Sequence, residues 1–170
     1  YGGTLKDVRT DDLASIPIKE LIKKTQIDPS HIDDVIIGCA NQAGEDNRNV
    51  ARMALLLAGI PYNVPGETIN RLCASGMSSV IHAHRAIKAN DGDLFISGGV
   101  ENMTRIEMGS DAGPFSDKIN DRFDIVAQGV SAELIAERYE FSRADLDALA
   151  LQSHQRAIHA IDQGYFEREI

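Results

Sequence analysis

The chain has 170 residues, of which 43% are hydrophobic and 25% charged, and its formal net charge is −9. This composition is typical of a folded domain, and the acidic balance excludes a nucleic-acid surface, which needs clustered Lys and Arg. No apolar run reaches the roughly 20 residues that cross a bilayer, and the two cysteines lack the close spacing of a disulfide framework or zinc site. We therefore expect a cytoplasmic protein without nucleic-acid, membrane or metal partners.

The first part of the chain has the pattern of a layered α/β fold. Residues 1–9 are expected to form a loop, and Thr10 is expected to cap a helix. The apolar face of that helix contains Leu13, Ile16, Leu21 and Ile22. Pro17 either kinks the helix or restarts it. Residues 35–37 form an apolar run before Gly38, which predicts a buried strand after the helix.

A second helix and a second extended run come next. Residues 49–58 predict a helix with Asn47 or Asn49 as its N-cap. Cys39, at the end of the first strand, is expected to be a buried and inert thiol, as most buried cysteines are. Residues 68–70 then form a short extended run.

Cys73 is the candidate nucleophile, because it lies where this extended run meets the start of a helix. The apolar residues that follow it recur at helical spacing, namely Met77, Val80, Ile81 and Ile87. Unpaired N–H groups and the helix dipole stabilise a thiolate at such a position and lower the pKa of the thiol. The same N–H groups are able to hold the oxyanion of an acyl-transfer intermediate. Position alone leaves open that Cys73 is a small core residue, since free cysteine is usually buried.

The pattern after Cys73 predicts a second buried strand. The helix is expected to end at residues 90–92, and residues 94–97 form the strand, followed by Gly98. His82 and His84 lie on different faces of the helix, so we expect structural or solvent-facing side chains rather than a joint metal site.

The last third of the chain changes character. Residues 106–128 are rich in Gly, Ser, Asp and Pro and predict an extended loop. A helical pattern resumes over residues 130–139. Ser142 and Asp145 then predict a capping box at the start of a long amphipathic helix, whose two histidines are expected at the surface.

Two segments resemble the thiolases, which include acetyl-CoA acetyltransferases and 3-ketoacyl-CoA thiolases. NRLCASGMSSV (70–80) is similar to the nucleophile segment of that family, and ISGGVENMTR (96–105) is similar to the strand that follows it. GCANQAGEDNRNVAR (38–52) and FSRADLDALALQSHQRA (141–157) resemble further thiolase segments. The resemblance runs through nearly the whole chain but covers only about half of such an enzyme.

This resemblance implies an α/β fold of the layered thiolase type, with a mixed sheet flanked by helices. Residues 1–105 would be part of the N-terminal half that carries the nucleophile, and residues 106–170 would begin an inserted, mostly helical loop domain. The first strand of the family fold would precede Tyr1, and its second half would follow Ile170.

The resemblance also implies a function, that of an acyl-CoA acyltransferase. Cys73 would carry the acyl group as a thioester while 3-ketoacyl-CoA is formed or cleaved. Coenzyme A thioesters would be the substrates, no cofactor would be bound permanently, and the protein would be a homodimer or tetramer.

Parts of the family's chemistry do not occur in residues 1–170. In thiolases a histidine in a GHP motif activates the cysteine, and a second cysteine in a CxGGG motif moves a proton. Neither motif is present, so we expect no turnover from this chain alone. Ala127 stands where many thiolases carry the histidine of an HMGxTAE segment, and the residues that contact coenzyme A stay unassigned.

Two alternatives remain at this point. A ketoacyl-synthase relative would also place a cysteine at a strand-to-helix turn but would condense its substrates irreversibly. A non-catalytic thiolase-like binding or assembly module would use residues 68–70 as a dimer edge, regardless of activity.

Overall fold

The computed structural model describes residues 1–168. The chain divides into two compact units, Tyr1–Gly113 and Pro114–Ile170, which are described separately. The assignment of residues 1–105 to a thiolase half and of residues 106–170 to a loop domain remains a prediction.

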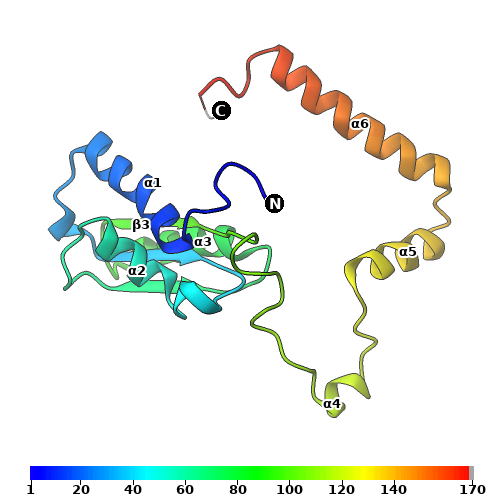
Figure 1. Ribbon diagram of the computed structural model, residues 1–170, viewed down its shortest axis with the longest axis horizontal. Coiled ribbons are helices and arrows are strands. Elements are labelled where there is room, and N and C mark those ends of the chain that lie inside the picture. The colour runs from blue at the N-terminus through cyan, green and yellow to red at the C-terminus, as the bar shows by residue number, and fades with distance from the viewer. Residues whose placement is uncertain (169–170) are drawn as a thin grey trace. The chain divides into compact units, whose positions relative to one another are not determined.

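The first unit is built on a three-stranded parallel sheet (Figure 1). The strand order is β2-β1-β3, with Gly38 at the end of β1 paired to Ile69 of β2 and to Gly99 of β3. Because parallel strands point the same way, the loops after all three strands emerge at one edge of the sheet. The elements are α1 (Thr10–Thr25), η1 (Pro29–His31), β1 (Asp34–Gly38), η2 (Gly44–Asp46), α2 (Val50–Leu57), β2 (Gly66–Ile69), α3 (Ser75–Ala89) and β3 (Phe95–Gly99).

The helices form layers on the two faces of this sheet. The main core lies between the sheet and the helices α1 and α2. It includes Ala14, Ile18, Val35, Ile37, Cys39, Val50, Ala54, Leu55 and Ile96. Helix α3 packs on the opposite face, where it approaches Gly38 and Gly99. The alternation of side chains along β1 explains the division, because Val35 and Ile37 point to one face and Gly38 to the other. The α/β class is confirmed, and the sheet of the described residues is parallel rather than mixed.

Helix α1 departs from its expected start and apolar face. Thr10 is its first residue rather than its cap, and the N-cap is Arg9, which makes no side-chain capping bond. The helix runs through Pro17 as one element. Ile16 and Leu21, expected in the core, are exposed. Its buried residues are Thr10, Asp11, Ala14, Ser15 and Ile18. The side chains of α1 that face the core are therefore smaller than those that the hydropathy pattern predicts.

The other elements of the first unit follow the sequence pattern closely. Asn49 is the cap of α2, since its side chain accepts a hydrogen bond from the Arg52 N–H at 3.1 Å. Both predicted strands occur, β1 as a buried strand and β3 shifted to Phe95–Gly99 with only Ile96 fully buried. Helix α3 ends at Ala89, and Asn90 adopts the left-handed conformation expected of a helix stop.

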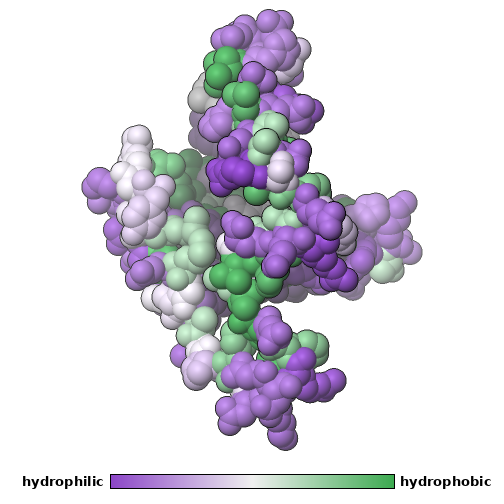
Figure 2. Space-filling view, turned by 90° about the vertical axis from the view of Figure 1, so that its right-hand side faces the viewer, coloured by the Kyte–Doolittle hydropathy of each residue, from purple (hydrophilic) through white to green (hydrophobic). Residues whose placement is uncertain are grey.

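The face of α3 that packs on the sheet is small and polar rather than apolar. Its buried residues are Ser75, Ser78, Ser79 and Ala83, whereas Met77, Val80 and Ile87 are exposed. Figure 2 shows apolar surface lying among hydrophilic surface on the face that it displays. Small residues face the sheet because the helix backbone comes very close to it.

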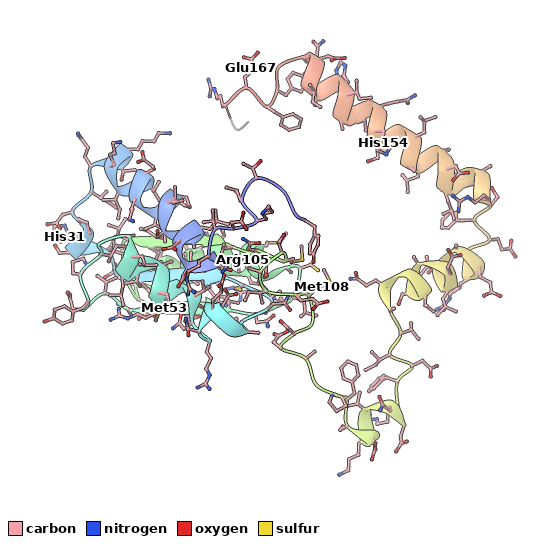
Figure 3. The ribbon with its side chains drawn as sticks, viewed as in Figure 1. His31, Met53, Arg105, Met108, His154 and Glu167 are labelled. Carbon is pink, nitrogen blue, oxygen red and sulfur yellow. The ribbon has the colours of Figure 1, made fainter. Side chains whose placement is uncertain are left out.

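The second unit contains three helices among its described residues, α4 (Asp117–Asn120), α5 (Gln128–Arg138) and α6 (Arg143–Asp162). Residues 106–128 were expected to form only a loop, but they contain one short helix, α4. The capping box is confirmed, since Ser142 and Asp145 bond each other's backbone N–H groups. His154 projects from α6 and is exposed (Figure 3). No helix within residues 1–168 has the length and hydropathy to span a membrane.

Candidate active site

The loop between β2 and α3 carries Cys73 at the edge where the strands of the sheet end. Cys73 is exposed and lies just before Ser75, the first residue of α3. This is the strand-to-helix position that the sequence predicts for a nucleophile. Its catalytic role stays a prediction.

The backbone before Cys73 has a left-handed residue that is not glycine. Leu72 has a φ of 48°, a conformation that costs energy for a residue with a branched side chain. The Leu72 N–H donates to Asn70 Oδ1 at 2.9 Å. The Leu72 carbonyl accepts from the Ser75 hydroxyl at 2.6 Å and from the Ser75 N–H at 3.0 Å. The turn that presents Cys73 is thus held by two side chains.

Glycines let the start of α3 come into contact with the sheet. A Cβ added to Gly38 would lie 2.2 Å from the carbonyl carbon of Ser75 and 2.4 Å from the nitrogen of Gly76. A Cβ on Gly99 would lie 3.2 Å from Gly76 Cα. The Ser79 hydroxyl also donates to the Gly98 carbonyl at 2.7 Å. The position of Cys73 relative to the sheet therefore depends on the absence of side chains here.

A second polar link joins the ends of the three strands. Glu101, after β3, accepts a hydrogen bond from the Ala40 N–H, after β1. Asn70, after β2, donates to the Ala40 carbonyl at 2.8 Å. The sequence pattern did not predict Asn70, Ser75 and Glu101 as parts of this edge. The available signals were a polar residue directly after β2, Asn70, and a carboxylate two residues after β3, Glu101.

The other cysteine has a different environment. Cys39 is fully buried, and its thiol donates to Asp46 Oδ2 at 3.3 Å. Burial raises the pKa of the Cys39 thiol far above its ordinary value, and the nearby carboxylates of Glu101 and Asp46 raise it further. Burial likewise raises the pKa of Asp46. These surroundings disfavour a thiolate at Cys39, in agreement with the expectation of an inert thiol.

An ion cluster braces the segments around the same sheet edge. Arg105, labelled in Figure 3, bonds Glu45 through two nitrogens at 2.6 and 2.9 Å. Arg9 bonds Asp11 at 2.9 Å and reaches Glu45 at 3.4 Å. The bonds from Arg105 are the main cause of the lowered pKa of Glu45. The cluster ties the segments before α1 and after β3 to η2, and we assign it a structural role.

Other candidate residues lie apart from Cys73 or in the second unit. His82 Nδ1 lies 3.6 Å from Glu67 Oε1, and His84 is exposed. Ala127 is the N-cap of α5, and its methyl side chain cannot accept a capping hydrogen bond. The described residues contain no group of three or more His, Cys, Asp and Glu side chains arranged to hold a metal ion.

Comparison with known families identifies the fold to which this site belongs. The family model described as "Thiolase, N-terminal domain" matches residues 1–170. The chain belongs to the thiolase family. The resemblance of the Cys73 and Gly98 segments to thiolases is thereby confirmed, and the match favours a thiolase over a ketoacyl-synthase relative.

Individual thiolases match over the whole chain. The 3-oxoadipyl-CoA/3-oxo-5,6-dehydrosuberyl-CoA thiolase of Escherichia coli K12 is 49% identical over 189 residues, covering 100% of this chain and 47% of that protein. The 3-ketoacyl-CoA thiolase of Chromohalobacter salexigens is 39% identical, covering 99% and 43%. The crystal structure of the Bacillus anthracis acetyl-CoA acetyltransferase has a TM-score of 0.81 at 34% identity, covering 100% and 46%. The chain spans about half the length of the curated relatives it matches.

Proposed function

We propose that this thiolase-family chain functions as part of an acyl-CoA acyltransferase, with Cys73 as the residue that carries the acyl group. The observation that supports this most strongly is the exposed Cys73 thiol at the start of α3, in the segment that resembles the thiolase nucleophile. The second thiol of the chain, Cys39, is buried and bonded to a carboxyl group. Only Cys73 is therefore accessible to a thioester substrate.

In the proposed reaction, the Cys73 thiolate attacks the carbonyl carbon of an acyl-CoA. The sulfur–carbon bond to the enzyme forms, the bond to coenzyme A breaks, and the leaving thiolate takes up a proton. In the cleavage direction, Cys73 attacks the 3-keto carbonyl of a 3-ketoacyl-CoA, the C2–C3 bond breaks, and C2 takes up a proton to leave acetyl-CoA. The thiol of a second coenzyme A then loses its proton and attacks the Cys73 thioester, which forms the shortened acyl-CoA and releases the Cys73 thiolate. The Cys73 N–H, which donates no hydrogen bond within residues 1–168, is suited to stabilise the developing oxyanion.

We propose coenzyme A thioesters as the substrates, without a permanently bound cofactor, and a 3-ketoacyl-CoA with a terminal carboxylate, such as 3-oxoadipyl-CoA, as the specific one. The support is identity, which is 49% to the E. coli 3-oxoadipyl-CoA thiolase and to the beta-ketoadipyl-CoA thiolase of Pseudomonas knackmussii. It falls to 34% for an acetyl-CoA acetyltransferase. Thiolysis rates of 3-oxoadipyl-CoA and acetoacetyl-CoA, measured on the full-length protein, test this choice. A higher kcat/KM for acetoacetyl-CoA would reject it.

Labelling of the two cysteines tests the role of Cys73. Iodoacetamide should alkylate Cys73 roughly 100 times faster than Cys39, because Cys39 reacts only when the core opens. Incubation of the full-length protein with an acyl-CoA should add the acyl mass to the Cys73 peptide. Cys73→Ser should abolish this adduct, and Cys39→Ser is the matched control that should keep it. Equal, slow labelling of both thiols would contradict the proposal.

A non-catalytic assembly role is the second candidate, and one observation favours it. Strand β2 is an outer strand of the sheet, and no other strand within residues 1–168 pairs with its outer side. That side is available to pair with a second copy of the chain. We propose a homodimer or a tetramer for the full-length protein in either case. A full-length protein that assembles and binds coenzyme A while Cys73 stays unreactive would support the assembly role over the enzyme.

A further inference from the structure

The geometry around Leu72 points to two positioning residues. We propose that Asn70 and Ser75 hold Leu72 in its left-handed conformation and thereby direct the Cys73 N–H toward the carbonyl oxygen of a bound acyl group. This inference rests on the proposed function, because it needs Cys73 to be the acyl carrier. Neither side chain would touch the substrate, so both would act through the backbone.

The two dihedral angles of Leu72 set the angle between the peptide planes on either side of it. The preceding plane carries the Leu72 N–H, which Asn70 Oδ1 accepts at 2.9 Å. The following plane carries the Leu72 carbonyl, which Ser75 holds through its hydroxyl and its N–H. Both planes are thus anchored by side chains, and this compensates for the unfavourable φ of Leu72.

Because Ser75 anchors the Leu72 carbonyl, it also decides where the Cys73 N–H points. The Leu72 carbonyl and the Cys73 N–H belong to the same peptide group, and residues 1–168 contain no cis peptide bond. In a trans peptide these two groups point in opposite directions. Because the carbonyl faces Ser75 in the first turn of α3, the Cys73 N–H points away from that turn. The N–H is left free of acceptors within residues 1–168.

The surroundings fix the two side chains themselves. Ser75 is 4% exposed, and its hydroxyl also accepts from the Arg71 N–H at 2.8 Å. Asn70 is anchored at its other end by the bond from its amide nitrogen to the Ala40 carbonyl at 2.8 Å. Neither side chain can turn away without losing a second hydrogen bond, so the turn is preorganised before substrate arrives.

Steady-state thiolysis of a 3-ketoacyl-CoA by the full-length protein tests the proposal. Asn70→Ala should lower kcat about tenfold with KM within roughly twofold, because a misdirected N–H stabilises the transition state less but leaves substrate binding intact. Leu72→Gly in the Asn70→Ala background should recover kcat to within about threefold of the unchanged protein, since glycine adopts positive φ freely. Leu72→Ala in that background should not, because alanine retains the penalty.

Controls separate positioning from folding and from the proposed function. Ser75→Ala should lower kcat as Asn70→Ala does, whereas Ser78→Ala, which removes a buried hydroxyl of the same helix that does not bond Leu72, should not. If Ser75→Ala fails to fold, the exposed Asn70 and Leu72 variants still decide. Equal recovery by Leu72→Gly and Leu72→Ala, a KM that rises in step with the loss of kcat, or an unchanged kcat in Asn70→Ala would overturn the inference. Turnover that survives Cys73→Ala would instead overturn the proposed function.

Discussion

Gly38→Ala is the sharpest test of how the sheet positions the candidate nucleophile. The new Cβ would lie 2.2 Å from the Ser75 carbonyl carbon and 2.4 Å from the Gly76 nitrogen, where ordinary contacts begin at 3.4 Å. The start of α3 would therefore have to retreat from β1 by roughly 1 Å or more. The atoms in the way belong to backbone, so no side-chain rotation can relieve the contact.

The size of the effect follows from this displacement. Overpacking costs about 1–3 kcal/mol of folding free energy, and we expect the upper end of that range because the clash is with backbone. A shift of about 1 Å in a reacting group lowers rates on the order of 100-fold. Cys73, which follows the same turn into α3, should move with the helix start. Acylation of Cys73 should slow accordingly.

Gly98→Ala provides the matched control for this substitution. Gly98 lies on β3 beside Ile37, and a Cβ built there meets no atom within 4 Å. Its unfolding free energy should change by less than about 0.5 kcal/mol, as for surface substitutions in general. Urea denaturation followed by circular dichroism, with acyl transfer to Cys73 measured in the native protein, compares the two variants. Equal effects of Gly38→Ala and Gly98→Ala would refute the steric reasoning.

Two further predictions concern the cap of α2 and the ion cluster. Asn49→Ala should cost about 1–2 kcal/mol of unfolding free energy, because it removes the N-cap of α2, the acceptor of the Thr68 hydroxyl and the donor to the Gly66 carbonyl. Asn49→Asp keeps the two accepted bonds and loses only the donated one, so it should lose less in the same urea titration. The pKa of Glu45 is lowered in the folded state, chiefly by Arg105, so its contribution is present above the unfolded pKa of glutamate and is lost as pH falls through the lower folded value. Glu45→Gln should therefore flatten the acid side of the curve of stability against pH, and a slope identical to that of the unchanged protein would contradict the role of the cluster.

Local sequence signals were reliable wherever a helix or strand was specified by its own residues. The Ser142 and Asp145 capping box, the Asn49 cap and the buried strand before Gly38 all occur as predicted, because each depends on neighbours close in sequence. The predicted apolar faces of α1 and α3 were wrong in part. Ile16 and Met77 are exposed, since small residues pack where two backbones approach closely.

The sequence by itself determined the family, the order of the elements and the position of Cys73 at the start of a helix, because these depend on short motifs and on residues adjacent in the chain. Only the tertiary structure decided which side chains support that cysteine. Asn70 reaches Ala40, Glu101 reaches the same residue from the loop after β3, and Gly38 makes room for α3. These contacts join residues some 30 to 60 positions apart, and they exist because the parallel strands end at one edge of the sheet.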